Sequence, residues 1–239
     1  MCSHIRLKID KERKMDGKGL VASRLAAIRA QLPAGVNLVA VSKFHPVGAL
    51  LEAYSVGQRV FGESRVQELM VKHDELPKDI EWHFIGSLQT NKVKYIAPFI
   101  SLIHSVDSLK LMREIDRQAE RNNRKIDVLL EVHIAQEETK HGMHPSALFE
   151  LLERGEWKSL NHIRIRGLMT MASFVSNEVQ IAHEFEQAEH LFSDVKKQFF
   201  SSDESFNLRS WGMSDDYPIA LLHGANIIRV GTAIFGARE

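Results

Sequence analysis

The sequence predicts one closed (β/α)8 barrel, a TIM barrel, with an extra helix at its N-terminal end. Eight short apolar runs rich in β-forming residues follow one another, and a helical pattern separates each from the next. The chain has 239 residues, close to the roughly 250 that such a barrel commonly needs. The main alternative is an open doubly wound sheet. Its usual marker, a G-x-G-x-x-G turn after the first strand, is absent here.

The predicted strands are continuous apolar runs bounded by turn residues. They are Leu38–Val41, Arg59–Phe61, Trp82–Ile85, Leu102–Ser105, Val128–Ile134, Ile163–Leu168, Asn207–Ser210 and Ile227–Val230. Such runs are typical of parallel strands covered on both faces. Parallel neighbours need crossover helices. The predicted helices supply them at Val47–Tyr54, Val66–His73, Asn91–Ile96, Leu109–Arg121, Pro145–Arg154, Val179–Phe199 and Pro218–His223.

The two ends of the chain depart from a regular barrel. Only residues 231–239 follow the last strand, too few for an ordinary outer helix. We expect the first helix, Gly19–Leu32, to cover that position. Residues 1–15 are charged and contain no apolar stretch, so they do not form a signal peptide, and we expect a loose tail there. Because no linker or low-complexity segment interrupts the rest, residues 16–239 are predicted to form a single domain.

Composition narrows the class of partners. The 31 basic residues balance the 31 acidic ones, which argues against binding to nucleic acid or a membrane surface. Cys2 is the only cysteine, so no intrachain disulfide forms, as suits a reducing compartment. No apolar run reaches the roughly 18 residues of a membrane span. We expect a cytoplasmic protein, and a monomer, since a closed barrel gives no evident reason to assemble.

Chemistry on such barrels sits where strands end, and Lys43 stands at the end of the first one. It follows the apolar run Val39–Val41 and Ser42. Burial and neighbouring positive charge favour the neutral amine of a lysine, which can attack an aldehyde. The alternative is a solvated lysine that merely ends a strand.

The last two strands end in residues suited to an anion. Gly212 and Gly231 permit close backbone approach, and Ser210, Ser214 and Thr232 offer hydroxyl and N–H donors. Barrels often hold phosphate in the loops after strands seven and eight, so we predict a phosphate site. The alternative is that these glycines only make tight turns.

Arg229 lies two residues before Gly231 and should share its face of the strand. A guanidinium carries only donors and stays charged. Facing a pyridine nitrogen, it would keep that nitrogen an acceptor and the ring a weak electron sink. The alternative is a structural, salt-bridged arginine.

Six segments in order resemble the YggS/PROSC family, the pyridoxal phosphate homeostasis proteins. They are LVAVSKFHP, RVFGESRVQE, EWHFIGSLQTNK, LLEVHIAQEETKHGM, IRGLMTMA and SWGMSDDYPIALLHGANIIRVGTAIFGAR. They extend from about Leu38 to Arg238. The resemblance implies a fold-type III barrel, similar to the N-terminal domain of alanine racemase, that binds pyridoxal 5'-phosphate (PLP).

The same resemblance assigns the site residues. The lysine of V-S-K, Lys43, would carry PLP as a Schiff base, and Arg229 would face the pyridine nitrogen. The phosphate would lie against residues of the last two loops: Ser210, Ser214, Gly231 and Thr232. Met169 of GLMTM would line the pocket, with His83 of WHFIG nearby.

This chain departs from the family pattern at three places. Ser64 and Arg65 replace the usual Asn-Tyr of F-G-E-N-Y, His133 replaces the Asn of E-V-N, and Trp211 replaces the first Met of S-M-G-M-S. Ser64 shortens a group expected near the cofactor, and Arg65 adds positive charge near the mouth of the site. None of these changes affects Lys43, Arg229 or the phosphate loops.

Two functions are compatible with this reading. The first, which we expect, is a protein that holds PLP for vitamin B6 homeostasis without turnover, exchanging it with PLP-dependent apo-enzymes or amino acids. The second is an amino-acid racemase of the alanine racemase type, which needs a second acid–base group, a tyrosine from a further domain. Only Tyr54, Tyr95 and Tyr217 are present here, and Tyr217 is the one that follows a site loop.

A metal site is not expected. His141 and His144, with Glu137 and Glu138, lie together in a polar segment after the fifth strand. Metal ligands usually need better-ordered supports, so these side chains are interpreted as solvated loop residues.

Overall fold

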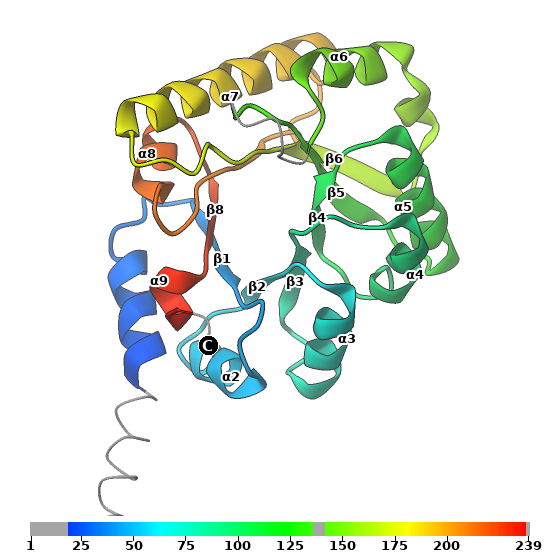
Figure 1. Cartoon of the computed structure of the whole chain (residues 1–239). Coiled ribbons are helices and arrows are strands. Elements are labelled where there is room, and N and C mark those ends of the chain that lie inside the picture. The colour runs from blue at the N-terminus through cyan, green and yellow to red at the C-terminus, as the bar shows by residue number, and fades with distance from the viewer. Residues whose placement is uncertain (1–18, 136–141, 238–239) are drawn as a thin grey trace, which may run out of the picture.

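The computed structural model describes residues 19–135 and 142–237, and they form the predicted barrel. All strands are parallel and pair in chain order, and β8 pairs with β1 to close the ring (Figure 1). The strands are β1 (Asn37–Val41), β2 (Val60–Glu63), β3 (Glu81–Phe84), β4 (Leu102–Val106), β5 (Ile126–Glu131), β6 (Ile163–Met169), β7 (Leu208–Ser210) and β8 (Ile227–Val230). The tail expected at residues 1–15 lies outside the described residues.

Helices surround the ring of strands (Figure 1). They are α2 (Val47–Ser55), α3 (Val66–Glu75), α4 (Val93–Ile96), α5 (Leu109–Arg121), α6 (Pro145–Arg154), α7 (Glu178–Phe199), α8 (Tyr217–Leu222) and α9 (Thr232–Phe235), with short 3-10 turns at Thr90–Lys92 and Glu156–Ser159. Local sequence sets their ends. Helix α7 starts where the Asn177 side chain accepts the N–H groups of Val179 and Gln180, and α6 stops at Gly155, which adopts the left-handed conformation favoured by glycine.

Two apolar layers result from the alternation of side chains along each strand. The larger layer lies between strands and helices and contains Trp82 and Phe84. The smaller one fills the interior of the barrel with Val39, Leu102, Leu129, Met169 and Ile227. On β3 and β4, alternation therefore turns His83 and His104 inward, where both are buried. The interior of the barrel is thus a packed core, and polar groups gather toward the carboxyl ends of the strands.

The N-terminal helix occupies the place where an outer helix after β8 would lie, as predicted (Figure 1). It spans residues 19–29 in the described part of the chain. Its Val21, Leu25 and Ile28 belong to the same buried cluster as Ile234 of α9. Arg24 Nη1 also donates to the carbonyl of Ile234 at 3.5 Å.

Two local expectations were wrong. The fifth strand ends at Glu131 rather than at Ile134, because the backbone beyond it pairs with Met143: His133 N–H donates to Met143 O, and Met143 N–H donates to Glu131 O. The short helix α9 was not predicted, since the four residues that form it show no periodicity of their own. None of the described helices is long and apolar enough to span a bilayer.

Candidate functional site

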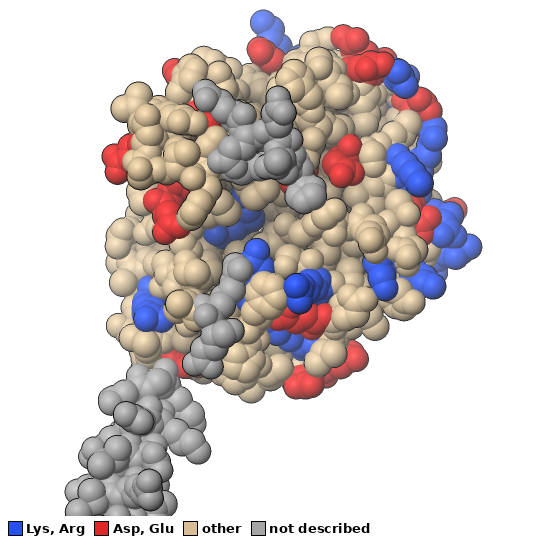
Figure 2. Space-filling model, viewed as in Figure 1, with Lys and Arg blue, Asp and Glu red and all other residues tan. Residues whose placement is uncertain are grey.

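A cavity of about 360 Å³ opens at the carboxyl ends of β1, β7 and β8. A volume of this size suits a small ligand. Figure 2 shows basic atoms recessed near the middle of this face of the molecule. The lining residues are Val41, Lys43, Ile85, Met171, Phe174, Met213, Ser214, Asp215, Arg229, Gly231 and Thr232.

Five of the predicted site residues line this cavity together. Lys43 comes from the end of β1, Ser214 from the loop after β7, and Arg229, Gly231 and Thr232 from β8 and the residues after it. The turn that follows Lys43 is backbone-strained, because Phe44 adopts a φ of 69°, a region that non-glycine residues rarely occupy. Such strain persists only where surrounding contacts hold it.

The loops after β7 and β8 converge on one hydroxyl. Ser214 Oγ accepts the N–H of Gly231 at 3.2 Å and that of Ala233 at 3.5 Å. A Cβ at Gly231 would lie 3.2 Å from the carbonyl oxygen of Val41, so a side chain there would crowd the end of β1. Backbone N–H groups already directed at a single acceptor oxygen are the arrangement that binds phosphate oxygens. The residues present therefore fit the phosphate group of the implied cofactor.

Arg229 is a buried cation held by uncharged acceptors. Its Nη1 donates to the carbonyl and the Oγ of Ser210, both at 2.6 Å, and its Nη2 donates to the carbonyl of Thr170 at 2.9 Å. Burial lowers the pKa of Arg229 to about 10, which leaves it protonated at neutral pH. Arg229 therefore presents a positively charged donor to the cavity. Such a donor is what would keep a pyridine nitrogen unprotonated, as a hydrogen-bond acceptor.

Two carboxyl groups lie near Arg229 without a direct ion pair to it among the described residues. Burial raises the pKa of Glu131 to about 7, with Asp107 adding to the effect and Arg229 opposing it. Burial also raises the pKa of Asp216, whose Oδ1 accepts the N–H of Met213 at 2.5 Å. The charge of Arg229 is therefore compensated only partly.

A chain of hydrogen bonds runs from Arg229 into the barrel. Because Arg229 can only donate, Ser210 Oγ accepts from it and has its own hydrogen to give to His104 Nδ1, 2.9 Å away. Burial lowers the pKa of His83 to about 4 and that of His104 well below its usual value, so each ring carries a single N–H. His104 then donates from Nε2 to His83 Nδ1 at 3.0 Å. In this arrangement, in which Ser210 donates to His104, both rings carry their hydrogen on Nε2.

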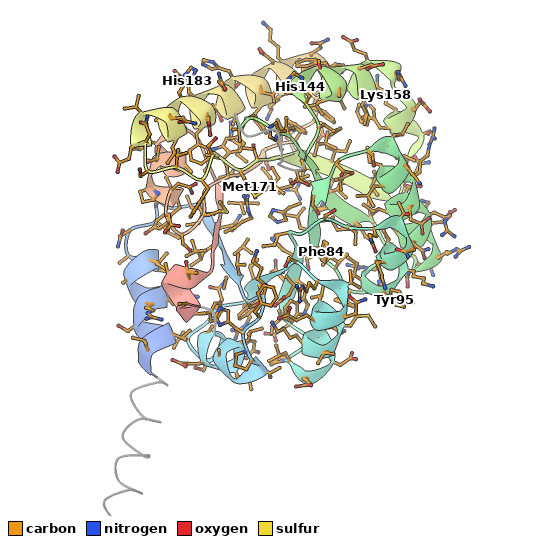
Figure 3. The ribbon with its side chains drawn as sticks, in the orientation of Figure 1. Phe84, Tyr95, His144, Lys158, Met171 and His183 are labelled. Carbon is orange, nitrogen blue, oxygen red and sulfur yellow. The ribbon has the colours of Figure 1, made fainter. Side chains whose placement is uncertain are left out.

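The other three predicted site residues lie beneath the cavity rather than on its wall. Ser210 and His83 belong to the chain of hydrogen bonds just described, and Met169 is 1% exposed in the interior apolar cluster. Met171, two residues after Met169, lines the cavity and lies over the open end of the barrel in Figure 3. Whether Ser210 also reaches a phosphate stays a prediction.

Sequence reasoning missed several polar residues near the site. Glu131 and His104 lie within strands and have apolar neighbours in the sequence. The alternation of side chains along a strand could have identified both as facing the interior of the barrel. Lys72 was also missed, although it shares a helical face with Leu69 and Leu76, both buried. A lysine with apolar residues three positions before it and four positions after it is the signal that could have identified it.

The residues that depart from the family pattern occupy different environments. The guanidinium of Arg65 lies 4.6 Å from the ring centroid of Phe44, next to Lys43. Trp211 is fully buried and donates from Nε1 to the carbonyl of His223. His133 lines a separate cavity with His144 and His190. Ser64 packs against Gly86, where a Cβ would lie 2.5 Å from the Ser64 carbonyl oxygen.

None of the chain's tyrosines lines the cavity, and all are in the described part. Tyr54 donates to Asp79, Tyr217 is 9% exposed and contacts Gln31, and Tyr95 lies on an outer helix (Figure 3). Of the histidine and glutamate cluster considered above, His141, Glu137 and Glu138 lie outside the described residues. Within them, no group of three or more His, Cys, Asp or Glu side chains could hold a metal ion.

Comparison with known proteins identifies the family. A family model described as the N-terminal domain of alanine racemase matches residues 19–239. A pyridoxal phosphate homeostasis protein of Aquifex aeolicus is 39% identical over 204 residues, 85% of this chain and 87% of that protein. One from Schizosaccharomyces pombe is 37% identical and covers 91% of this chain and 93% of its own. The chain belongs to the family of pyridoxal phosphate homeostasis proteins.

Solved structures support the same assignment. The structure of PipY of Synechococcus elongatus was solved with PLP bound, and PipY is 39% identical to this chain. The match has a TM-score of 0.82 and covers 90% of this chain and all of PipY. An alanine racemase of Clostridium difficile has a TM-score of 0.71 at 15% identity, covering 93% of this chain and 60% of the racemase. That likeness shows the shared barrel fold alone.

Proposed function

We propose that this chain binds PLP in the cavity at the ends of β1, β7 and β8, with Lys43 as its covalent anchor, and serves PLP homeostasis. The observation that carries the proposal is that a lysine, an arginine and a cluster of N–H and hydroxyl donors line one cavity. The names of the relatives and the PLP held by PipY support the same ligand.

In this proposal, different residues of the cavity bind different parts of PLP. The amine of Lys43 condenses with the aldehyde of PLP: a C=N bond forms, the C=O bond breaks, and water leaves. The N–H groups of Gly231 and Ala233, with the hydroxyls of Ser214 and Thr232, bind the phosphate. Arg229 donates to the ring nitrogen and keeps it an acceptor.

Holding the cofactor without turnover is the function we favour. Racemisation needs a second acid–base group opposite the lysine, and none of the tyrosines lines the cavity. The racemase alternative is supported by the shared fold and by the lysine. An assay for D-alanine formed from L-alanine separates the two: turnover by the protein, lost in Lys43→Ala, would establish the racemase.

We further propose a cytoplasmic monomer that exchanges PLP with amino acids or PLP-dependent apo-enzymes. The balanced charge and the single cysteine support such a compartment. Transfer to a purified apo-enzyme, compared with the rate of simple dissociation into buffer, measures whether delivery needs contact between the two proteins.

The central experiment is an absorbance spectrum of the protein with PLP, before and after borohydride reduction, followed by peptide mass mapping. The proposal predicts a visible band that reduction converts to a pyridoxyl adduct on Lys43. Lys43→Ala should lose the band and retain weak, phosphate-mediated binding. A band of wild-type strength in Lys43→Ala would refute the anchor, and no band in the wild type would refute PLP binding by a Schiff base.

A further inference from the structure

We propose that Lys72, Glu68 and Glu63 form a charged clamp that fixes the backbone on both sides of Lys43 and so aims its amine into the cavity. The inference rests on the proposed function, because it assigns a task to residues around the proposed anchor. Lys72 and Glu68 belong to α3, and Glu63 ends β2. These three are positioning residues, since none of them lines the cavity.

Lys72 is the centre of the clamp. Its side chain is 5% exposed, and its Nζ donates to Ser42 O, Glu63 Oε1 and Glu68 Oε1, each at 2.7 Å. An ammonium group has one N–H for each of these acceptors, so its donors are all used. A buried ammonium is tolerated only with such complete pairing, and the pairing fixes its position relative to β1 and β2.

The residue before Lys43 is held at three atoms. Ser42 N–H donates to the carbonyl of Gly62 at 3.0 Å, as part of the contact between β1 and β2. Ser42 Oγ donates to Glu63 Oε1 at 2.6 Å, and Ser42 O accepts from Lys72. Ser42 is fully buried, so these bonds lie in a medium where they are strong.

The residue after Lys43 is held by the same group of charges. Phe44 N–H donates to Glu68 Oε1 at 2.6 Å, the oxygen that also accepts from Lys72. This bond supports the φ of 69° at Phe44, a conformation that costs a non-glycine residue free energy. Lys72 therefore connects the restraint before Lys43 with the one after it.

The clamp acts on the condensation itself. For a C–N bond to form, the lone pair of the lysine must approach the aldehyde carbon in a defined direction, and a small misplacement of the amine slows such a step strongly. The phosphate and the ring are held by other elements, β7, β8 and the loops after them. Loss of the clamp should therefore impair formation of the Schiff base more than non-covalent binding of the ring and phosphate.

The decisive comparison is Glu68→Ala with Glu68→Gln. A glutamine oxygen still accepts the Phe44 N–H, whereas alanine removes the acceptor. Glu150→Ala on α6 is the matched control, because Glu150 is an exposed carboxylate in an i,i+4 pair with Arg154. Two ligands are compared: PLP, followed by its visible band, and pyridoxine 5'-phosphate, which has no aldehyde and is followed by calorimetry.

The clamp predicts that Glu68→Ala lowers the rate and extent of Schiff-base formation by about tenfold, the effect of one charge-assisted hydrogen bond. Affinity for pyridoxine 5'-phosphate should stay within about twofold, and Glu68→Gln and Glu150→Ala should resemble the wild type. The clamp is overturned if Glu68→Ala forms the adduct as the wild type does, or loses affinity for both ligands equally. A wild type that forms no adduct would instead overturn the proposed function.

Lys72→Met provides a second test because methionine keeps the length of the side chain and removes its charge and donors. In preparations whose thermal transition shows that they are folded, Lys72→Met should lose Schiff-base formation with PLP and keep its affinity for pyridoxine 5'-phosphate. Equal loss for both ligands would mean that Lys72 supports the barrel generally. If Lys72→Met does not fold, the Glu68 pair decides the question, since Glu68 is 21% exposed and its loss buries no new charge.

Discussion

Two cations are buried among the described residues, Lys72 and Arg229, and their partners differ in kind. Lys72, behind β1 and β2, is bonded to two carboxylates and a carbonyl. Arg229, on β8, is bonded to two carbonyls and a hydroxyl. Lys72 lies outside the cavity and Arg229 lines it. The charge of Lys72, which holds the backbone, is compensated by carboxylates. The charge of Arg229, which faces the expected ligand, is left available.

This difference follows from the cost of burial. A buried cation that binds no ligand needs opposite charge from the protein, because neutral acceptors alone recover less of its lost hydration. A cation that meets an acceptor or anion from solution needs neutral partners that orient it without neutralising it. The pKa of Glu131 is raised to about 7, which reduces its negative charge beside Arg229, and burial raises the pKa of Asp216 as well.

Removal of the compensated cation should have the largest effect on stability. Lys72→Met leaves Glu63, whose side chain is 0% exposed, without its ammonium partner. We expect a loss of about 3–5 kcal/mol in the free energy of unfolding near neutral pH. Urea unfolding followed by circular dichroism measures it, with Arg59→Met in the exposed pair with Asp79 as the control expected to cost at most about 1 kcal/mol.

The pH dependence of the Lys72→Met loss checks its cause. Burial already raises the pKa of Glu63, and removal of Lys72, which lowers it, should raise it further. A raised carboxyl pKa means that the folded state binds more protons, so stability falls as pH rises through the shifted range. The loss should therefore shrink in acid; a loss independent of pH would indicate a packing defect instead.

Removal of the ligand-facing cation should affect binding more than folding. Arg229→Gln replaces a charged donor by a neutral one, and we expect PLP affinity to fall by about 10–100-fold. The cofactor's absorbance should shift as its ring nitrogen loses the charged donor. Titration of the variant and the wild type with PLP, followed by the absorbance spectrum, checks this. Unchanged spectra and affinity would make Arg229 a structural residue like Lys72.

The smallest effect expected is an increase in stability. Since the pKa of Glu131 is raised to about 7, the folded state binds more protons than the unfolded state between that pH and the ordinary range of a carboxyl group. Stability therefore falls as pH rises through this window, and Glu131→Gln removes that loss. We expect the variant to be more stable than the wild type by about 2 kcal/mol near pH 8 and equal to it near pH 4.

Urea unfolding of both proteins at the two pH values is the measurement for Glu131. Asp107→Asn serves as a partial control, because Asp107 also raises the pKa of Glu131 and its removal should give a smaller effect of the same sign. A Glu131→Gln variant that is less stable at both pH values would show that the carboxylate compensates Arg229, contrary to the comparison above.

The sequence by itself determined the barrel and five of the residues that line its cavity. Eight continuous apolar runs separated by helical periods leave few other ways to bury the strands on both faces. Lys43 and Arg229 were found because they stand at or near strand ends, where barrels place their chemistry. The shared surroundings of Ser214, Gly231 and Thr232 followed from the adjacency of the last two strands.

The tertiary structure alone decided which polar groups meet. The sequence separation between Lys72 and Ser42, or between His104 and Ser210, carries no signal of contact. The pairing of β1 with β2 and the packing of α3 bring the first pair together, and the closing of the ring brings the second pair together. The depth of a side chain along its strand was likewise undetermined: Met169 lies in the core and Met171 at the cavity. Alternation fixes the face that a residue occupies, but the register and tilt of neighbouring strands fix its height.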